Sequence, residues 1–221
     1  MKSKVVHSFV VLFLSISIAG QVPVREEPRH KVALQNHYIR LLDVRIQPGD
    51  TSLFHVHQIP SFFIPLSTTA IGSEVKGQAP RQSRFPLDST WYNGFENGPL
   101  IHRVWNNDTN VLHVIDLELL ATKNSTLPNN IQLPFKIDFE NEKLRVYKFQ
   151  LQAGQIIALP LIMTPMLLIS VAGADLELKD SARKNLVYLK AGSFQWLDPQ
   201  QRVEISNHGS VSTHSILILF K

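Results

Sequence analysis

Apolar residues in this chain occur in short runs, which either alternate with polar residues or continue for a few positions. Turn-forming pairs separate the runs, among them Pro48-Gly49, Asn93-Gly94, Asn129-Asn130 and Ala153-Gly154. Alternation of this kind is the periodicity of β-strands, and such pairs commonly lie in the turns between strands. No stretch of helical length carries a 3.6-residue apolar stripe. The pattern therefore predicts an all-β fold.

The strand pattern occurs twice along the chain. Residues 36–49 and 141–154 align without a gap at an offset of 105. The identical pairs at this offset are Asn36 and Asn141, Arg40 and Arg145, Gln47 and Gln152, and Gly49 and Gly154. Near the ends of the two halves, an offset of 101 aligns Asn106 with Asn207 and His113 with His214. Two copies of one β unit, each of about a hundred residues, explain the chain better than a single sandwich.

The first residues have the features of an export signal. Lys2 and Lys4 precede an apolar run over 9–18, and Ser17-Ile18-Ala19 fits a small-x-small cleavage site. This predicts a signal peptide over 1–19 and a periplasmic or secreted protein, with an uncleaved N-terminal anchor as the alternative. The apolar run is short for a membrane span.

The remaining boundaries follow composition. A leader rich in Pro, Glu, Arg and His covers 20–31, the first domain 32–122, a linker dense in Asn, Ser, Thr and Pro 123–134, and the second domain 135–221. The sequence has no cysteine, so it offers no disulfide framework and no thiolate metal ligand.

Composition narrows the range of partners. Hydrophobic residues make up 44% of the chain and charged residues 18%, which is a globular balance. The formal net charge is +4, without a block of Lys or Arg, so a nucleic-acid surface has little support. No second hydrophobic span follows the first, so we expect no membrane contact after signal cleavage.

Histidines form the main candidate site. His55 and His57 flank Val56 on a predicted strand, so both side chains point to one face, roughly 6 to 7 Å apart along it. Two imidazoles at that spacing can reach one metal ion, and His102 begins a later predicted strand. If the strands around Asn107-Asp108 form a hairpin, His113 lies opposite His102. His113 also shares one side of its strand with Ile115, Leu117 and Leu119, and we expect this more apolar side to face inward. His113 would then point into the barrel, as a fourth ligand, a group orienting a ligand, or the general base; the plainer alternative is a hydrogen-bonded core histidine.

These residues resemble the motifs of the cupin superfamily. Gly49, five residues and His55-x-His57 look like the first cupin motif, and His102-x3-Asn106 looks like the end of the second. With the repeat, the resemblance covers nearly all of the chain after the predicted signal peptide and implies two tandem jelly-roll barrels, a bicupin. The family's metal-binding Glu is absent, since its expected position holds Ser61 or Phe62.

The resemblance also implies a metal. A face of three histidines, His55, His57 and His102, is similar to the cupin subset that includes cysteine dioxygenase. Such a face could hold iron, copper, manganese, nickel or zinc, and its uncompensated charge favours an anionic ligand. In the second copy, Pro160 and Ile162 replace the first two histidines and Val203 the third, so we expect no metal there.

Two functions remain open from the sequence. One is a metal-dependent enzyme, first a dioxygenase and second an isomerase or hydrolase, acting on a small anionic molecule. The other is a non-enzymatic cupin that binds a sugar, a metal or another small ligand, and pairing into a homodimer is compatible with both. The fold alone does not separate them, because one fold hosts many functions.

Overall fold

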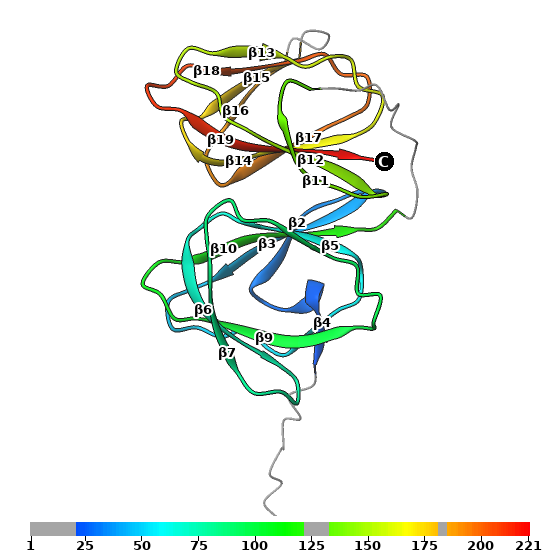
Figure 1. Cartoon of the computed structure of the whole chain (residues 1–221), viewed down its shortest axis with the longest axis vertical. Helices are drawn as coiled ribbons and strands as arrows, with labels where there is room; N and C mark the ends of the chain where they lie inside the picture. Colours follow the sequence, from blue (N-terminus) through cyan, green and yellow to red (C-terminus); the bar gives the residue numbers. More distant parts are fainter. Residues whose placement is uncertain (1–20, 122–132, 181–184) are drawn as a thin grey trace, which may run out of the picture.

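The computed structural model describes residues 21–121, 133–180 and 185–221, and these residues are mostly β-strands (Figure 1). The all-β prediction is therefore confirmed. The predicted signal peptide and the linker up to residue 132 lie outside the described residues. In the three described ranges, no helix has the length and hydropathy needed to cross a membrane.

The first domain is a barrel of two five-stranded sheets. In spatial order, the first sheet contains β1 (Val22–Pro23), β4 (His55–His57), β9 (Leu100–Asn106), β6 (Thr69–Val75) and β7 (Arg81–Phe85). The second contains β2 (His30–Gln35), β3 (Ile39–Ile46), β10 (Leu112–Leu119), β5 (Ser61–Pro65) and β8 (Trp91–Asn93). A short 3-10 helix, η1 (Val24–Glu26), links β1 to β2.

The second domain repeats this arrangement. Its five-stranded sheet contains β11 (Lys136–Glu140), β12 (Leu144–Phe149), β19 (Thr213–Phe220), β14 (Met166–Gly173) and β17 (Ser193–Leu197). Its four-stranded sheet contains β13 (Ile156–Ala158), β18 (Val203–Asn207), β15 (Leu176–Asp180) and β16 (Asn185–Leu189). The order β12-β19-β14 matches β3-β10-β5, as two tandem jelly-roll barrels require.

The residues shared by the two repeats form the same hydrogen bonds in both barrels. Gly49 and Gly154 have φ angles of 74° and 76°, in the left-handed region that favours glycine. The N–H of Gly49 donates to the carbonyl of Asn106 at 3.0 Å, and that of Gly154 donates to the carbonyl of Asn207 at 2.8 Å. The repeat in the sequence is thus a repeat of one hydrogen-bonded corner of the barrel, formed by Gly49 with Asn106 and by Gly154 with Asn207. We call this corner the bracket.

The two asparagine side chains complete the bracket. Nδ2 of Asn106 donates to the carbonyls of Ile46 and Asn110 at 2.9 and 2.7 Å. Nδ2 of Asn207 donates to the carbonyls of Leu151 and Val211 at 2.9 and 2.8 Å. Both residues are at most 1% exposed, so their bonds are protected from water.

An apolar core joins the two barrels. It lies between the sheet that contains β10 and the sheet that contains β19, so these sheets pack face to face (Figure 1). Its fully buried members include Ile39, Leu41, Phe62, Ile64, Ile115, Leu117, Leu144, Val146, Leu167, Ile169, Ile216 and Ile218. Polar contacts also join the domains beside this core. Thr90 of the first domain donates a hydrogen bond to Asp138 of the second at 2.7 Å, and Asp138 is paired with Lys148 at 3.2 Å.

The shared core decides how β10 is oriented. Its residues Ile115, Leu117 and Leu119 face the second domain, so Val114 and Asp116 face the interior of the first barrel and line its cavity. The sequence predicted the opposite orientation, on the premise that the more apolar side of the strand faces inward. That premise fails here because a second domain covers the outer face.

His113 consequently lies outside the barrel. The prediction that it points into the barrel, where it could act as the catalytic base, is therefore wrong. Its Nε2 lies 2.7 Å from Oδ1 of Asp43, and its ring faces Gly192 of the second domain. The predicted hairpin pairing with His102 is also not formed. The strands β9 and β10 belong to different sheets, and His102 lies opposite His55 instead.

The residues expected to form a leader, 20–31, are part of the barrel from Val22 onward. Val22 and Pro23 pair in parallel with His55 and Val56 of β4. Val24 is 3% exposed, and Glu27 is 1% exposed. This segment therefore closes one side of the first barrel and brings its polar residues into the interior.

The bracket predicts a matched loss of stability in the two domains. Replacing either Asn106 or Asn207 with Ala removes at least two buried hydrogen bonds and leaves carbonyls unpaired, so we expect each substitution to cost roughly 2 to 4 kcal/mol. Urea unfolding measures this cost. Thr109→Ala, at an exposed turn position, is the control and should change the free energy of unfolding by less than about 0.5 kcal/mol. Equal stabilities of the Asn variants and the control would contradict the structural role of the bracket.

Candidate metal centre

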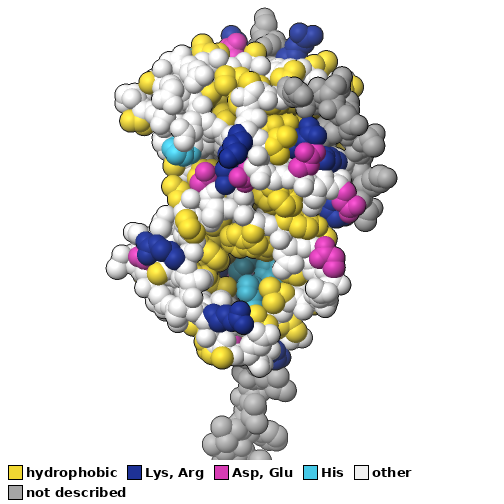
Figure 2. Space-filling view, in the orientation of Figure 1, with side chains coloured by type: hydrophobic (Ala, Val, Ile, Leu, Met, Phe, Trp, Pro, Cys, Tyr) yellow, Lys and Arg dark blue, Asp and Glu magenta, His cyan; other side chains and the backbone are white. Residues whose placement is uncertain are grey.

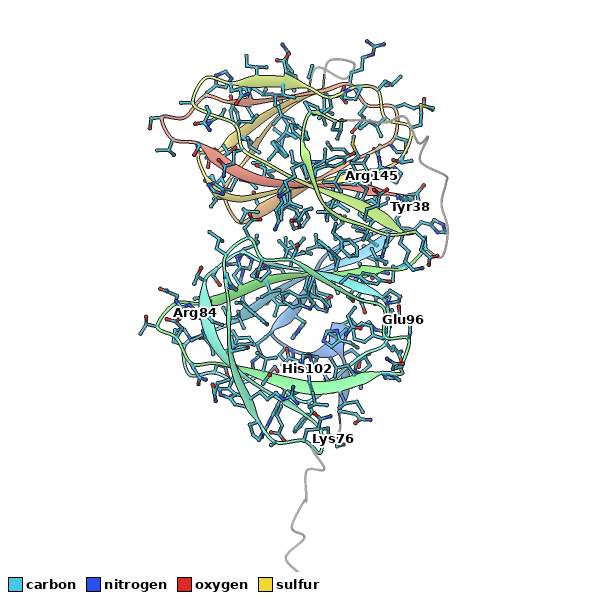
Figure 3. The ribbon with its side chains drawn as sticks, in the orientation of Figure 1. Tyr38, Lys76, Arg84, Glu96, His102 and Arg145 are labelled. Atoms are coloured by element: carbon cyan, nitrogen blue, oxygen red, sulfur yellow. The ribbon has the colours of Figure 1, made fainter. Side chains whose placement is uncertain are left out.

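Three histidines from neighbouring strands meet inside the first barrel. His55 and His57 lie on one face of β4 and are 1% and 3% exposed. The register of β4 with β9 places His102 opposite His55, and the centroids of these two rings are 4.6 Å apart. The ring of His102 is also 5.0 Å from that of His57. Figure 3 shows His102 on β9, inside the first barrel.

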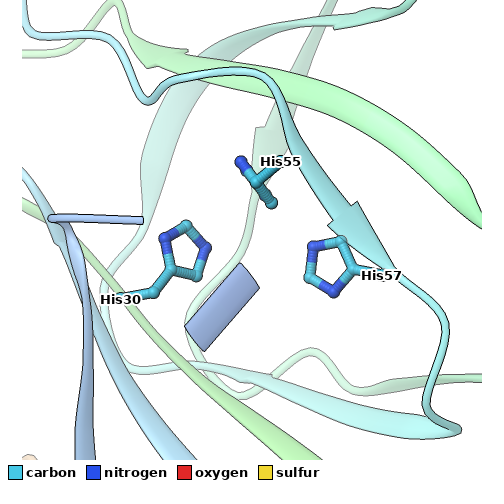
Figure 4. Close-up of side chains that lie close together, drawn as sticks. All are labelled: His30, His55 and His57. Carbon is cyan, nitrogen blue, oxygen red and sulfur yellow. The ribbon is translucent and has the colours of Figure 1, made fainter. Parts of the chain in front are cut away.

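A fourth histidine, which the sequence analysis did not identify, completes the cluster. His30 begins β2, and its ring centroid lies 4.5 Å from that of His55. One ring nitrogen from each of His30, His55 and His57 lies within 4.8 Å of the others, close enough to share one metal ion (Figure 4). Among the described residues His102 is not part of this set of three, although its ring lies beside those of His55 and His57. His30 stands alone in a segment without a histidine motif. Its place follows from the pairing of β2 with β3, which sets His30 opposite Val44, a residue that also lines the cavity.

A buried carboxylate orients His30. Oε2 of Glu27 lies 2.7 Å from Nδ1 of His30, and the same oxygen accepts the backbone N–H of Arg29 at 2.7 Å. Oε1 of Glu27 accepts the N–H of Leu53 at 3.1 Å. These bonds hold the pKa of the Glu27 carboxyl below its usual value despite burial. A carboxylate on Nδ1 leaves Nε2 of His30 available as a metal ligand.

The other ring nitrogens support a metal site in the same way. Nδ1 of His55 lies 2.8 Å from the carbonyl of Leu53, which fixes the tautomer with Nε2 unprotonated. Nε2 of His55 and Nε2 of His102 are buried and have no hydrogen-bond partner in the described part of the chain. Buried polar atoms without partners are costly, and a bound cation would satisfy both. The donor set therefore fits a divalent metal that accepts imidazole ligands.

Burial keeps these imidazoles neutral. It lowers the pKa of His55 to about 3, with further lowering from His30 and His102, and it lowers the pKa of His102 to about 4. Burial and the same neighbours lower the pKa of His57 as well. Neutral imidazole is the form that binds a metal, so this site needs no proton release near neutral pH.

One carboxyl group faces the cluster from β10. Asp116 is 1% exposed, and its Oδ2 lies 3.5 Å from Nδ1 of His57. Burial and the neighbouring Glu118 raise the pKa of Asp116 to about 8, against the opposing effect of the Ser61 hydroxyl. Glu118 itself is paired with Arg40 at 2.6 Å. The inward face of β10 thus carries both a paired and an unpaired carboxyl group.

The two positions expected for the family's glutamate take other roles. Ser61 is fully buried, and its hydroxyl donates to the carbonyl of Ile59 at 3.0 Å. Phe62 belongs to the core between the two domains. Neither residue offers a carboxylate to the histidines, in agreement with the sequence analysis.

The cluster forms one end of a small cavity of about 70 Å³. Apart from the four histidines and Asp116, its lining is apolar and aromatic: Val44, Ile46, Phe63, Phe85, Trp91, Val104, Leu112 and Val114. Figure 2 shows histidine atoms at the bottom of a hollow in this face of the first domain, with hydrophobic side chains around it. The space suits a small ligand with an apolar part.

The second barrel has an apolar interior at the corresponding place. Leu159, Ile162 and Val203 are at most 6% exposed and belong to its hydrophobic core. Val203 stands at the position that aligns with His102, and its carbonyl accepts the N–H of Leu159 at 2.9 Å. This half supplies packing in place of ligands.

Comparisons with known proteins identify the fold. No protein-family model matches the chain, and no curated protein matches it in sequence. Among solved structures, AerE from Microcystis aeruginosa matches with a TM-score of 0.59 and 14% identity, over 88% of this chain and 98% of its own. A cupin 2 conserved barrel domain protein from Leptotrichia buccalis gives 0.55 and 8% identity, over 85% and 86%. A salicylate 1,2-dioxygenase from Pseudaminobacter salicylatoxidans gives 0.59 and 9% identity, over 89% and 77%.

These similarities confirm the cupin fold that the motifs indicated, and the sheets of the two barrels agree with a bicupin arrangement. At such low identity they concern the fold alone. The function of this chain depends on the residues of its site.

The lowered histidine pKa values predict how acid affects the metal-free protein. An unfolded histidine has a pKa of about 6.5, so the unfolded state takes up protons as the pH falls below that value. In the folded state His55 and His102 stay neutral over the same range, so the unfolded state becomes favoured. Each imidazole should therefore cost about 1.4 kcal/mol of stability per pH unit between roughly pH 6.5 and pH 4.5. Asp116, with its raised pKa, acts in the opposite sense.

Urea unfolding of the wild type and a His55→Gln/His102→Gln variant from pH 7 to pH 4.5 isolates the histidine contribution. Because Asp116 is common to both proteins, the difference between them should change by about 3 kcal/mol per pH unit below pH 6.5. Parallel pH profiles would contradict the burial of neutral imidazoles.

Proposed function

We propose that this chain is an exported metal-dependent oxygenase that acts on a small organic molecule in the cavity of its first barrel. The observation that carries the proposal is the cluster of four imidazoles that lines the apolar cavity, in which Nε2 of His55 and Nε2 of His102 are buried without a partner in the described part of the chain. Such a cluster is expensive to bury unless it binds a cation. The proposed export depends on the segment over 1–19.

The ligands we propose are His55, His57 and His102 from the motifs, together with His30. When bound, the metal would supply open coordination positions for the substrate and for dioxygen. Imidazole ligands suit iron and copper, the two ions that favour oxygen chemistry, and also manganese, nickel and zinc. The salicylate 1,2-dioxygenase among the structural neighbours is, by its name, an oxygenase of a small carboxylate.

The cavity suggests the type of substrate. Neutral imidazoles leave the charge of a divalent ion uncompensated, which favours an anionic group at the metal. Among the described residues that line the cavity there is no Lys or Arg, so nothing but the metal would attract that group. The apolar lining favours a hydrophobic body for the remainder. We therefore propose a small anion with an apolar part, such as a short-chain or aromatic carboxylate.

Metal content is the first test. We expect mass spectrometry of the untagged mature protein to find close to one equivalent of iron or copper, and His55→Ala/His57→Ala to lose it. Oxygen uptake should then depend on an added small carboxylate. Stoichiometric zinc or manganese would favour an isomerase or a hydrolase. A metal-free protein that retains a small ligand would favour the binding-protein alternative.

His30 provides a test that the sequence motifs do not. We expect His30→Ala to weaken metal binding by one to two orders of magnitude, because the substitution removes a ligand that Glu27 holds in place. A competition titration with a chromogenic chelator measures the change. His37→Ala, at an exposed histidine seven residues later, should bind as the wild type does. Equal affinities of the two variants would remove His30 from the site.

A further inference from the structure

Among the described residues that line the cavity, Asp116 carries the one carboxyl group, and no hydrogen bond of normal geometry reaches it. The Ser61 hydroxyl, which is near enough to lower its pKa, donates to the carbonyl of Ile59 instead. Neither Oδ1 nor Oδ2 has a partner, and the same is true of Nδ1 of His57, 3.5 Å from Oδ2. Both side chains are at most 3% exposed, so water does not compensate them at the surface. A pair of partnerless polar groups that face each other in a protein interior needs a reason.

Folding alone does not supply that reason. The neighbouring inward residues of β10 are Val114, which is apolar, and Glu118, which is paired with Arg40. An apolar residue at position 116 would match the rest of the cavity wall, while an unpaired carboxyl group there destabilises the barrel. A residue that costs stability at the edge of a site is a candidate for function.

The other histidines of the cluster show what such a group can do. Nδ1 of His30 is held by Glu27 at 2.7 Å, and Nδ1 of His55 is held by the carbonyl of Leu53 at 2.8 Å. In both, a buried oxygen fixes Nδ1, so that Nε2 is left for a metal. For Nδ1 of His57, Oδ2 of Asp116 is the oxygen in the corresponding position, and closing 3.5 Å to a normal hydrogen bond requires a shift of less than about 1 Å.

We propose that Asp116 is a positioning residue of the metal centre, which accepts a hydrogen bond from Nδ1 of His57 and thereby directs Nε2 of His57 to the metal. This inference rests on the proposed metal site. In the family motif, a carboxylate at position 61 or 62 would itself bind the metal. Here the carboxylate comes from β10 and supports a histidine ligand. The first barrel then holds two histidine–carboxylate pairs, His30 with Glu27 and His57 with Asp116.

Metal affinity and stability together test the proposal. Asp116→Asn and Asp116→Leu should weaken metal binding 10- to 100-fold in a chelator competition. The metal-free variants should have an unchanged or higher melting temperature, because the substitutions remove an unpaired buried carboxyl group. A purely structural residue would show the reverse, with lower stability and unchanged affinity.

The chain contains a matched control on the opposite face of the same sheet. Asp43 pairs with His113 at 2.7 Å outside the barrel, so Asp43→Asn removes a carboxylate from a histidine without touching the cluster. We expect its metal affinity to equal that of the wild type. A double-mutant cycle with His57→Ala adds a second check, since Asp116→Asn should have no further effect on affinity once His57 is absent.

A measurement on the wild-type protein tests the positioning role of Asp116 even if the variants do not fold. In the zinc-loaded protein, ¹⁵N shifts of the histidine rings should show His57 protonated at Nδ1 and ligated through Nε2. Ligation through Nδ1, or affinities of the Asp116 variants within twofold of the wild type, would overturn the positioning role while leaving the metal site intact. Failure of the wild type to bind metal would instead overturn the proposed function, and this inference with it.

Discussion

The apolar contact between the two barrels is the constraint on which the rest of this structure depends. Each barrel presents one face of a five-stranded sheet to the other, and the residues between them are almost completely buried. Both faces of β10 are therefore covered, one by the second domain and one by the interior of its own barrel. Of the two apolar clusters that contain residues of β10, the one between the domains has more members. The more polar face of β10, with Asp116 and Glu118, is therefore left for the interior of the first barrel, where Asp116 lines the cavity.

This constraint explains where prediction from the sequence succeeded. The offsets of 105 and 101 that align the halves also align the strands, and the matched Asn and Gly residues form the same hydrogen bonds in each copy. Those residues recur because a left-handed turn and a buried amide bracket are required twice. The alternation of His55 and His57 was equally informative, because that strand has one face toward the cavity.

The same constraint explains where prediction failed. His113 was assigned to the interior because alternation identifies two faces of a strand without telling which one a second domain will cover. His30 was missed for a different reason, since its place depends on the pairing of β2 with β3, which local sequence patterns do not reveal. The role of Asp116 follows from the orientation of β10 and could not be assigned before it. The sequence thus predicted the fold and three histidines of the cluster, and tertiary packing supplied the remainder.

The chain positions of the clustered side chains have a consequence for the order of assembly. In an extended chain, His55 and His57 are the one pair close enough to chelate together, while His30 and His102 lie 25 and 45 residues away from them. Bringing those partners in requires long loops to close, β4 to pair with β9, and β2 to pair with β3 in the other sheet. Before the strands pair, a metal ion would find only the two ligands His55 and His57 close together in the chain. The full set of ligands exists only in the folded barrel, so the metal that binds would depend on which ions are present where the barrel folds.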